Sequence, residues 1–199
     1  MRKLVICLLI SLMGVCVSTS LGTTVYTNEA SFTAQLQPGY NLETFTGYGP
    51  YQNLGSDVDF GAGSYAWHAH ASAYTLWAAL DGAITAGESD AHIQMTFGSA
   101  VTAVGGNFTT VDDTFETASN TIVLTLADAT TVTTNSWAFV GFVSPGVPIV
   151  SLDVYCPDGV NGGLMPTIDN IYTGSAVPEP ATMCLLGLGA LGLLRKRRA

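Results

Sequence analysis

The chain has 199 residues, of which 48% are apolar and 10% aromatic; this is enough for one domain with a core and too short for two ordinary domains. Its six basic residues lie at the two ends, so the interval from Leu4 to Leu194 contains all fifteen acidic residues and no Lys or Arg. This distribution excludes nucleic-acid binding, because phosphate contacts depend chiefly on Lys and Arg. The acidity either keeps an exported protein soluble or attracts Ca²⁺, which prefers carboxylate and carbonyl oxygens.

Residues 1–22 have the pattern of a secretory signal peptide. Arg2 and Lys3 precede an apolar stretch from Leu4 to Val17, and small residues follow it. We therefore expect the chain to be exported, with the export machinery as a partner and this segment removed.

Residues 23–174 are expected to form a mainly β domain, a β-sandwich with one short N-terminal helix. The helix is predicted to begin after Asn28, its N-cap, and to present Phe32 and Leu36 as an apolar i, i+4 pair. Beyond it, many short strands with turn signals favour a sandwich. Strands are predicted at Asn41 to Thr46, Ile93 to Phe97, Val101 to Val104, Thr121 to Leu126, Thr130 to Thr134, Trp137 to Val143, Ile149 to Tyr155 and Thr167 to Tyr172.

The clearest pair of strands is a predicted β-hairpin over residues 121–134. Ile122, Leu124 and Leu126 alternate with polar or smaller side chains, so they share one face of the first strand. The three residues 127–129 then suit a short hairpin loop.

The densest aromatic stretch spans residues 67–77. If it is extended, His68 and His70 share one face and Trp67 faces away. Exposed Trp and Tyr rings can stack on sugars, and the two histidines can ligate a transition metal with a third ligand such as His92. Packing in the core is the alternative, because alternate Ala residues favour a closely packed face. The candidate glycan contacts are Trp67, His68, His70, Tyr74 and Trp77.

Acidic residues gather in two further places, and neither predicts a catalytic centre. Asp112, Asp113 and Glu116 lie in one expected loop, and Asp57 and Asp59 lie upstream; neither set has EF-hand spacing, so solvated loops are favoured over calcium sites.

No G-x-S-x-G or H-E-x-x-H motif occurs, and we expect no enzyme. A hydrolase stays the alternative, because a pair of catalytic carboxylates is defined by distance in space.

The C-terminus combines three features in the order of a sorting signal. A linker at residues 175–180 contains Pro178, Glu179 and Pro180, and an apolar run at 181–194 is expected to be a short transmembrane helix. Residues 195–199 form a basic tail that should stay cytoplasmic and stop translocation. The basic residues of this tail are Arg195, Lys196, Arg197 and Arg198.

These features resemble the PEP-CTERM sorting signal of exported proteins in Gram-negative bacteria, a tail that is also described as an ice-binding protein C-terminal domain. The resemblance implies that an exosortase, a membrane protease, recognises the Pro178-Glu179-Pro180 segment. It also implies a transient anchor in the inner membrane, followed by release to the cell surface or the extracellular matrix.

The middle of the chain resembles the jelly-roll-like domain that is common in front of this signal. The segments that carry the resemblance are Leu42 to Phe45, Ile93 to Phe97, Val101 to Phe108, Phe139 to Phe142 and Ile168 to Tyr172. Such domains are similar to carbohydrate-binding sandwiches that hold a structural Ca²⁺. The resemblance implies Glu43 and Asp169 as calcium ligands and Asn170 as a weaker third, whereas turn or edge hydrogen bonding by Asp169 and Asn170 is the alternative.

The sequence therefore predicts an exported, non-enzymatic protein sorted by a PEP-CTERM signal. We expect it to bind glycan or to act structurally in exopolysaccharide or biofilm. A hydrolase that acts on polysaccharide is the alternative.

Overall fold

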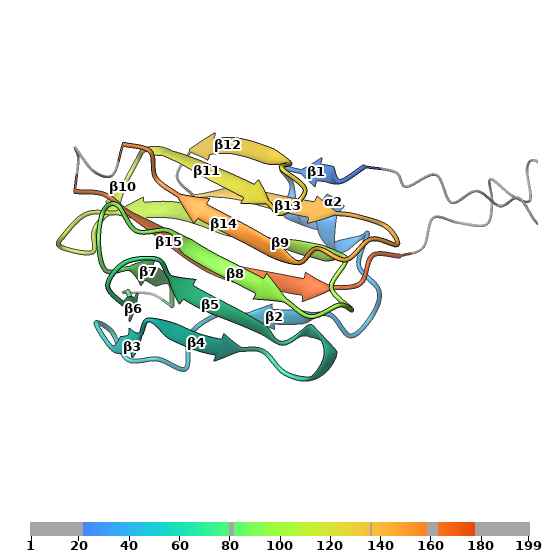
Figure 1. The fold of residues 1–199 in the computed structure, drawn as a ribbon, viewed down its shortest axis with the longest axis horizontal. Coiled ribbons are helices and arrows are strands. Elements are labelled where there is room, and N and C mark those ends of the chain that lie inside the picture. The colour runs from blue at the N-terminus through green and yellow to red at the C-terminus, as the bar shows by residue number, and fades with distance from the viewer. Residues whose placement is uncertain (1–21, 80–81, 136, 159–162, 178–199) are drawn as a thin grey trace, which may run out of the picture.

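The computed structural model describes residues 22–79, 82–135, 137–158 and 163–177 and is mainly β over these residues. Two antiparallel sheets pack face to face, and one short helix lies outside them (Figure 1). The predicted mainly β sandwich with a short N-terminal helix is confirmed. No helix within the described ranges is long and apolar enough to cross a bilayer. Residues 1–21 of the predicted signal peptide and the predicted helix at 181–194 lie outside those ranges.

The larger sheet has nine strands among the described residues and the smaller has six. The nine-stranded sheet contains β1 (Thr24–Tyr26), β2 (Asn41–Glu43), β3 (Asn53–Gly55), β6 (Leu76–Ala78), β7 (Ile84–Ala86), β9 (Ala103–Val111), β10 (Thr117–Ala118), β13 (Ala138–Val143) and β15 (Met165–Gly174). The six-stranded sheet contains β4 (Asp57–Phe60), β5 (Trp67–Ala71), β8 (Ile93–Phe97), β11 (Thr121–Leu126), β12 (Thr131–Asn135) and β14 (Ser151–Tyr155). The helix α2 spans Glu29–Thr33, and a 3₁₀ turn, η1, spans Gly63–Tyr65.

The main core lies between the two sheets and follows the period of two along each strand. In β11, Ile122, Leu124 and Leu126 are buried, and the residues between them are partly exposed. In the central strand β9, Phe108 faces this core, and almost every residue of the strand is buried. β9 is buried on both sides because a second apolar cluster covers part of the outer face of its sheet.

This second cluster is built by α2. Asn28 caps the helix, since its Oδ1 accepts a hydrogen bond from the backbone N–H of Ser31 at 2.9 Å, as the sequence predicts. Phe32 then packs over Gly105 and Gly141, where an added Cβ on Gly105 would lie 3.0 Å from the ring. The remaining members of the cluster are Leu36, Ala103, Phe139, Val143, Tyr172 and Ala176.

The predicted strands at 93–97 and 121–126 have the expected bounds, and the β11–β12 hairpin is confirmed. The short strands β3, β4, β6 and β7 were not predicted. Residues 176 and 177 are bonded to the sandwich: the N–H of Ala176 donates to Thr102 Oγ1 at 2.7 Å, and the N–H of Val177 donates to the carbonyl of Gln35 at 2.7 Å. The domain thus continues to Val177, at the end of the sandwich where β1 begins (Figure 1).

Candidate functional site

The aromatic stretch at 67–77 is divided between the two sheets. Its first part is β5, in which Trp67 points into the core and is 2% exposed. The Trp67 ring stacks on Phe60, with centroids 4.6 Å apart and an interplanar angle of 27°. Trp67 is therefore not an exposed platform for a sugar, and this part of the predicted glycan site is corrected. Ala69 and Ala71 follow it on the same buried face, so this face of β5 packs in the core.

His68 and His70 lie on the opposite face of β5, as its alternation predicts. Their cross-strand partners on β4 are Asp59 and Asp57, so the outer side of this hairpin carries two histidines against two aspartates. His68 Nδ1 lies 2.9 Å from Asp59 Oδ1, and His70 Nδ1 lies 2.9 Å from Asp57 Oδ1. We call this surface, formed by Asp57, Asp59, His68 and His70, the histidine face.

The electrostatics of the histidine face follow from these pairs. Hydrogen bonding to Asp59 raises the pKa of His68 above its usual value, because the carboxylate favours the imidazolium form. Hydrogen bonds from Ser56 and then His70 lower the pKa of Asp57 to about 2. Asp57 and Asp59 lie on a strand, whereas a solvated loop was predicted for them.

His92 makes a similar pair further across the same sheet. Its Nδ1 lies 2.7 Å from Asp153 Oδ2, and its ring stacks on Tyr155 with centroids 4.2 Å apart. His92 thus pairs with an aspartate of its own, whereas Asp57 Oδ1 is shared: it lies 2.9 Å from His70 Nδ1 and 3.2 Å from His68 Nε2. Among the described residues, no group of three His, Cys, Asp or Glu side chains is placed to hold a metal ion. The geometry gives no support to a transition-metal site that combines His92 with His68 and His70.

The second part of the aromatic stretch crosses to the edge region of the nine-stranded sheet. Tyr74 is 62% exposed in the loop after β5, and Trp77 is half-buried in the middle of β6. Both rings border Gly87, which follows β7: an added Cβ on Gly87 would lie 2.7 Å from Tyr74 Cδ1 and 2.8 Å from Trp77 Nε1. The missing side chain at Gly87 therefore allows the two rings to gather at one point of the surface.

Two more aromatic residues come to the same region from other loops. The backbone N–H of Tyr51 donates to the carbonyl of Ala78 at 2.9 Å, which places Tyr51 beside the strand that carries Trp77. The Tyr51 ring meets Phe115 edge to face, with centroids 5.1 Å apart. We call the set of Tyr51, Tyr74, Trp77 and Phe115 the aromatic end.

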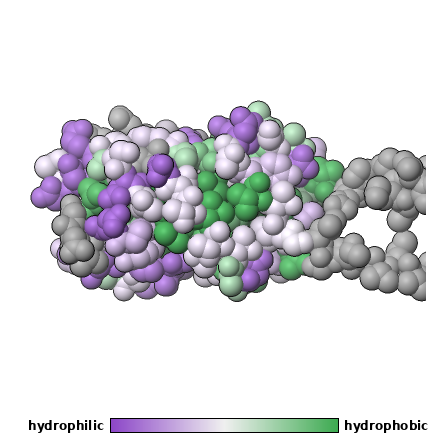
Figure 2. All heavy atoms as spheres, turned by 90° about the horizontal axis from the view of Figure 1, so that it is seen from above, coloured by the Kyte–Doolittle hydropathy of each residue, from purple (hydrophilic) through white to green (hydrophobic). Residues whose placement is uncertain are grey.

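The backbone at the aromatic end is unusual for such large side chains. Tyr51, Tyr74 and Phe115 have φ values of 57°, 63° and 64°, a region that bulky residues rarely adopt. Strained positions of this kind persist where the surrounding structure fixes them, and they cluster at functional sites. Their loops lie away from the chain termini (Figure 1). Figure 2 shows the face that is turned upward in Figure 1, on which hydrophilic residues gather toward the end away from the chain termini.

The loop around Phe115 is held by one aspartate. Asp112 Oδ1 accepts hydrogen bonds from the N–H of Thr114 at 2.9 Å and from the N–H of Glu116 at 3.0 Å. The side-chain hydrogen bond from Thr114 and the backbone bond from Glu116 lower the pKa of Asp112. Asp112 is thus a turn-forming residue, which agrees with the loop that the sequence predicts.

Of the three predicted calcium ligands, Asp169 and Asn170 lie together at the bulge of β15, and Glu43 lies on the neighbouring strand β2. Glu43 is paired with the inward-facing Ile171 on β15, whereas Asp169 is paired with Asn107 on the outer face, so a β-bulge separates the two carboxylates. Glu43 Oε1 accepts the N–H of Phe45 at 3.0 Å. Asn170 donates from its side-chain amide to Asp169 Oδ2 at 2.8 Å, and burial raises the pKa of Asp169. Calcium binding at Glu43, Asp169 and Asn170 stays a prediction.

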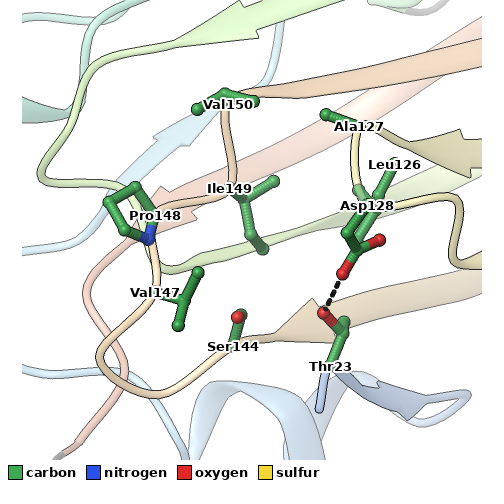
Figure 3. A pocket seen from close by; sticks show the side chains of 9 residues that line it. All are labelled: Thr23, Leu126, Ala127, Asp128, Ser144, Val147, Pro148, Ile149 and Val150. Atoms are coloured by element: carbon green, nitrogen blue, oxygen red, sulfur yellow. Dashed lines mark hydrogen bonds between the residues drawn. The ribbon is translucent and has the colours of Figure 1, made fainter. Parts of the chain in front are cut away.

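Two hollows lie elsewhere on the domain. One of about 400 Å³ opens beside the histidine face and is lined by Asp59, His68 and Thr96, among others. The other, of about 260 Å³, lies between the β11–β12 and β13–β14 loops, and a 2.9 Å hydrogen bond from Thr23 to Asp128 crosses it (Figure 3). Its remaining wall is mostly apolar, formed by Val147, Pro148, Ile149 and Val150 with other neighbours.

The sequence predicted Tyr74 and Trp77 but missed Tyr51, Phe115 and Gly87. Gly87 is ten residues from Trp77 in the chain, and the β6–β7 pairing that brings them together has no strong sequence signal. Tyr51 and Phe115 each lie in a turn-like segment of the sequence, and the occurrence of a large aromatic residue in such a segment was the only signal for them.

Comparison with known proteins identifies the C-terminal segment. A family model for the PEP-CTERM protein-sorting motif matches residues 176–198, so the chain carries this signal, as the sequence predicts. The motif residues Pro178, Glu179 and Pro180 and the basic residues 195–198 lie outside the described ranges. The motif implies export, processing by exosortase and sorting to the bacterial cell surface. No curated protein and no solved structure matches the chain.

Proposed function

We propose that this chain, an exported protein sorted through its PEP-CTERM motif, is a non-enzymatic, jelly-roll-like module that binds glycan through the aromatic end. The observation that carries the proposal is the gathering of the Tyr74 and Trp77 rings over Gly87. Exposed aromatic rings offer flat apolar faces, and Tyr and Trp also carry a hydroxyl or an indole N–H that can hydrogen-bond to a ligand. This combination suits a sugar ring, which has apolar C–H faces and a polar rim.

The position of the aromatic end also supports the proposal. Val177, where the described domain ends, precedes the processing motif and lies at the end of the sandwich where β1 begins. The aromatic loops lie toward the other end, so they would project away from the membrane while the chain is anchored. We infer that the protein is anchored transiently in the inner membrane and, once processed, acts at the cell surface or in the extracellular matrix, with exopolysaccharide as its partner.

Binding to exopolysaccharide of the host bacterium tests the proposal. The processed protein should be retained on the polysaccharide, and Tyr74→Ala or Trp77→Ala should weaken binding about tenfold or more, because aromatic anchors contribute most of the free energy at such sites. The measurement is the dissociation constant from depletion of protein by increasing amounts of polysaccharide.

The matched control is Trp137→Ala. Trp137 is also exposed, at 50%, and also has a positive φ of 58°, but it precedes β13, which β9, β15 and β7 separate from β6. This variant should bind like the wild type. Equal loss in all three variants would contradict a site at the aromatic end, and release of new reducing ends would favour the hydrolase.

A further inference from the structure

The charge of the domain restricts the class of glycan that the aromatic end can bind. Residues 4–194 contain no Lys or Arg, so the three histidines are the basic side chains of this interval. His68, His70 and His92 each pair with an aspartate on the six-stranded sheet. The aromatic end thus has no basic side chain to meet an anionic sugar.

Carboxylates instead flank the aromatic residues. Glu88 directly follows Gly87, and Asp113 and Glu116 lie on either side of Phe115 within the same loop; all three are exposed. Asp112 differs from them, because its carboxylate is occupied in the turn. Glu88, Asp113 and Glu116 are therefore exposed negative charges close in the chain to residues of the aromatic end.

Aromatic faces and carboxylates attract the same kind of ligand. The negative face of a Trp or Tyr ring attracts an ammonium group, and nearby carboxylates add Coulomb attraction that salt screens. A uronate would meet repulsion from the same groups, and a neutral sugar would gain no Coulomb attraction from them, although its hydroxyl groups can donate hydrogen bonds to a carboxylate. Charge complementarity thus separates three classes of glycan.

We propose that the aromatic end binds a glycan that carries protonated amino groups, such as an amino-sugar polymer from which part of the N-acetyl groups have been removed. This inference rests on the proposed glycan binding and names its ligand class. The rings contact the sugar face, and Glu88 and Asp113 meet the ammonium groups.

Three hexamers test the inference with the processed protein: β-1,4-linked glucosamine, the same hexamer fully N-acetylated, and galacturonate. By calorimetric titration, the glucosamine hexamer should bind at least tenfold more tightly than its N-acetylated form in low salt. This preference should fall below about threefold in 0.5 M NaCl, where the Debye length is a few ångströms. The galacturonate hexamer should not bind.

The variant Glu88→Gln/Asp113→Asn should reduce the preference for glucosamine without reducing binding of the N-acetylated hexamer. Asp59→Asn, which removes an exposed carboxylate on the other sheet, is the matched control and should leave the preference unchanged. Equal affinity for the two amino-sugar hexamers, or tighter binding of galacturonate, would overturn the inference while leaving glycan binding intact. Failure of all three hexamers together with host polysaccharide to bind would overturn the proposed function itself.

Discussion

Two groups of aromatic residues on the outer side of the nine-stranded sheet pack against glycines, but one group is buried and the other is exposed. Phe32, on α2, lies against Gly105 and Gly141. At the end of the sandwich away from the chain termini, Tyr74 and Trp77 lie against Gly87. The first ring is fully buried, whereas Tyr74 is 62% exposed. A glycine admits an aromatic ring close to the backbone in both places. The Phe32 ring, which α2 carries, is enclosed by a packed cluster and stabilises the fold, whereas the exposed Tyr74 ring stays available to a ligand.

The two groups belong to one continuous face of the sheet. Trp77 is paired with Thr85, and Thr85 is paired in turn with Thr167 on β15. Thr167 is paired with Thr109 on β9, the strand that carries Gly105. Since paired residues share a face, the covered and exposed rings differ in their neighbours and not in the side of the sheet.

The largest expected difference between the two groups is in the free energy of unfolding. Phe32→Ala should lower it by about 3–5 kcal/mol, because a buried ring is lost and α2 loses its contact with the sheet. Tyr74→Ala should change it by less than about 0.5 kcal/mol, as expected for an exposed side chain. Urea unfolding followed by tryptophan fluorescence measures both values.

If Tyr74→Ala were as destabilising as Phe32→Ala, the aromatic end would be a part of the core and not a binding surface. Trp137→Ala serves as the exposed control, although it also removes one of the fluorescent groups. Circular dichroism is therefore the second probe for that variant.

A smaller difference is expected at the glycines. An added Cβ on Gly141 would lie 2.7 Å from Phe32 Cγ, inside a packed cluster, so Gly141→Ala should lower the free energy of unfolding by about 1–3 kcal/mol. At Gly87 two of the three close neighbours are ring atoms of the partly exposed Tyr74 and Trp77, which can move outward, and the third is the backbone carbonyl oxygen of Thr75 at 2.9 Å. Gly87→Ala should therefore destabilise less than Gly141→Ala but weaken glycan binding, because Tyr74 and Trp77 are displaced.

Measuring stability and glycan affinity for both glycine variants separates the two roles. Gly141→Ala should retain its affinity under conditions where it is folded. Unchanged affinity in Gly87→Ala would contradict the role of the gathered rings.

The sequence predicts those structural features of the domain that depend on a local pattern of residues. Asn28 and Phe32 are recognisable because a cap and an i, i+4 pair are local features, and β11 is recognisable from its alternating Ile and Leu. The burial of Trp67 and the exposure of Tyr74 are harder to predict. Strand alternation buries Trp67, but the loop that follows β5 breaks that period, so the exposure of Tyr74 depends on tertiary structure.

The candidate site was less predictable than the fold for the same reason. β4, β6 and β7 are only three or four residues long, which is too short for a recognisable alternation, although they contain β-favouring residues such as Val58, Trp77 and Ile84. The meeting of Gly87 with Tyr74 and Trp77 and the facing of Asp57 and Asp59 toward the histidines both depend on the pairing of these strands.

The smallest expected effect concerns the histidine face, where polar groups are exposed and no helix covers them. The raised pKa of His68 means that its pair with Asp59 contributes stability below the ordinary histidine pKa of about 6.5 and loses it as the pH rises through the raised value. Since the His68 side chain is 38% exposed, solvent screening limits this contribution to less than about 1 kcal/mol.

The comparison of wild type with His68→Gln isolates this contribution from other titrating groups. The difference in unfolding free energy between the two proteins should be largest near pH 5.5 and shrink by pH 8.5, and Asp59→Asn should reproduce it. In a proton NMR titration, the His68 imidazole should titrate at a lower pH in Asp59→Asn than in the wild type. A difference that grows with pH would contradict a raised pKa of His68. A difference of several kcal/mol would mean that this open face stabilises the fold as strongly as the covered ring of Phe32.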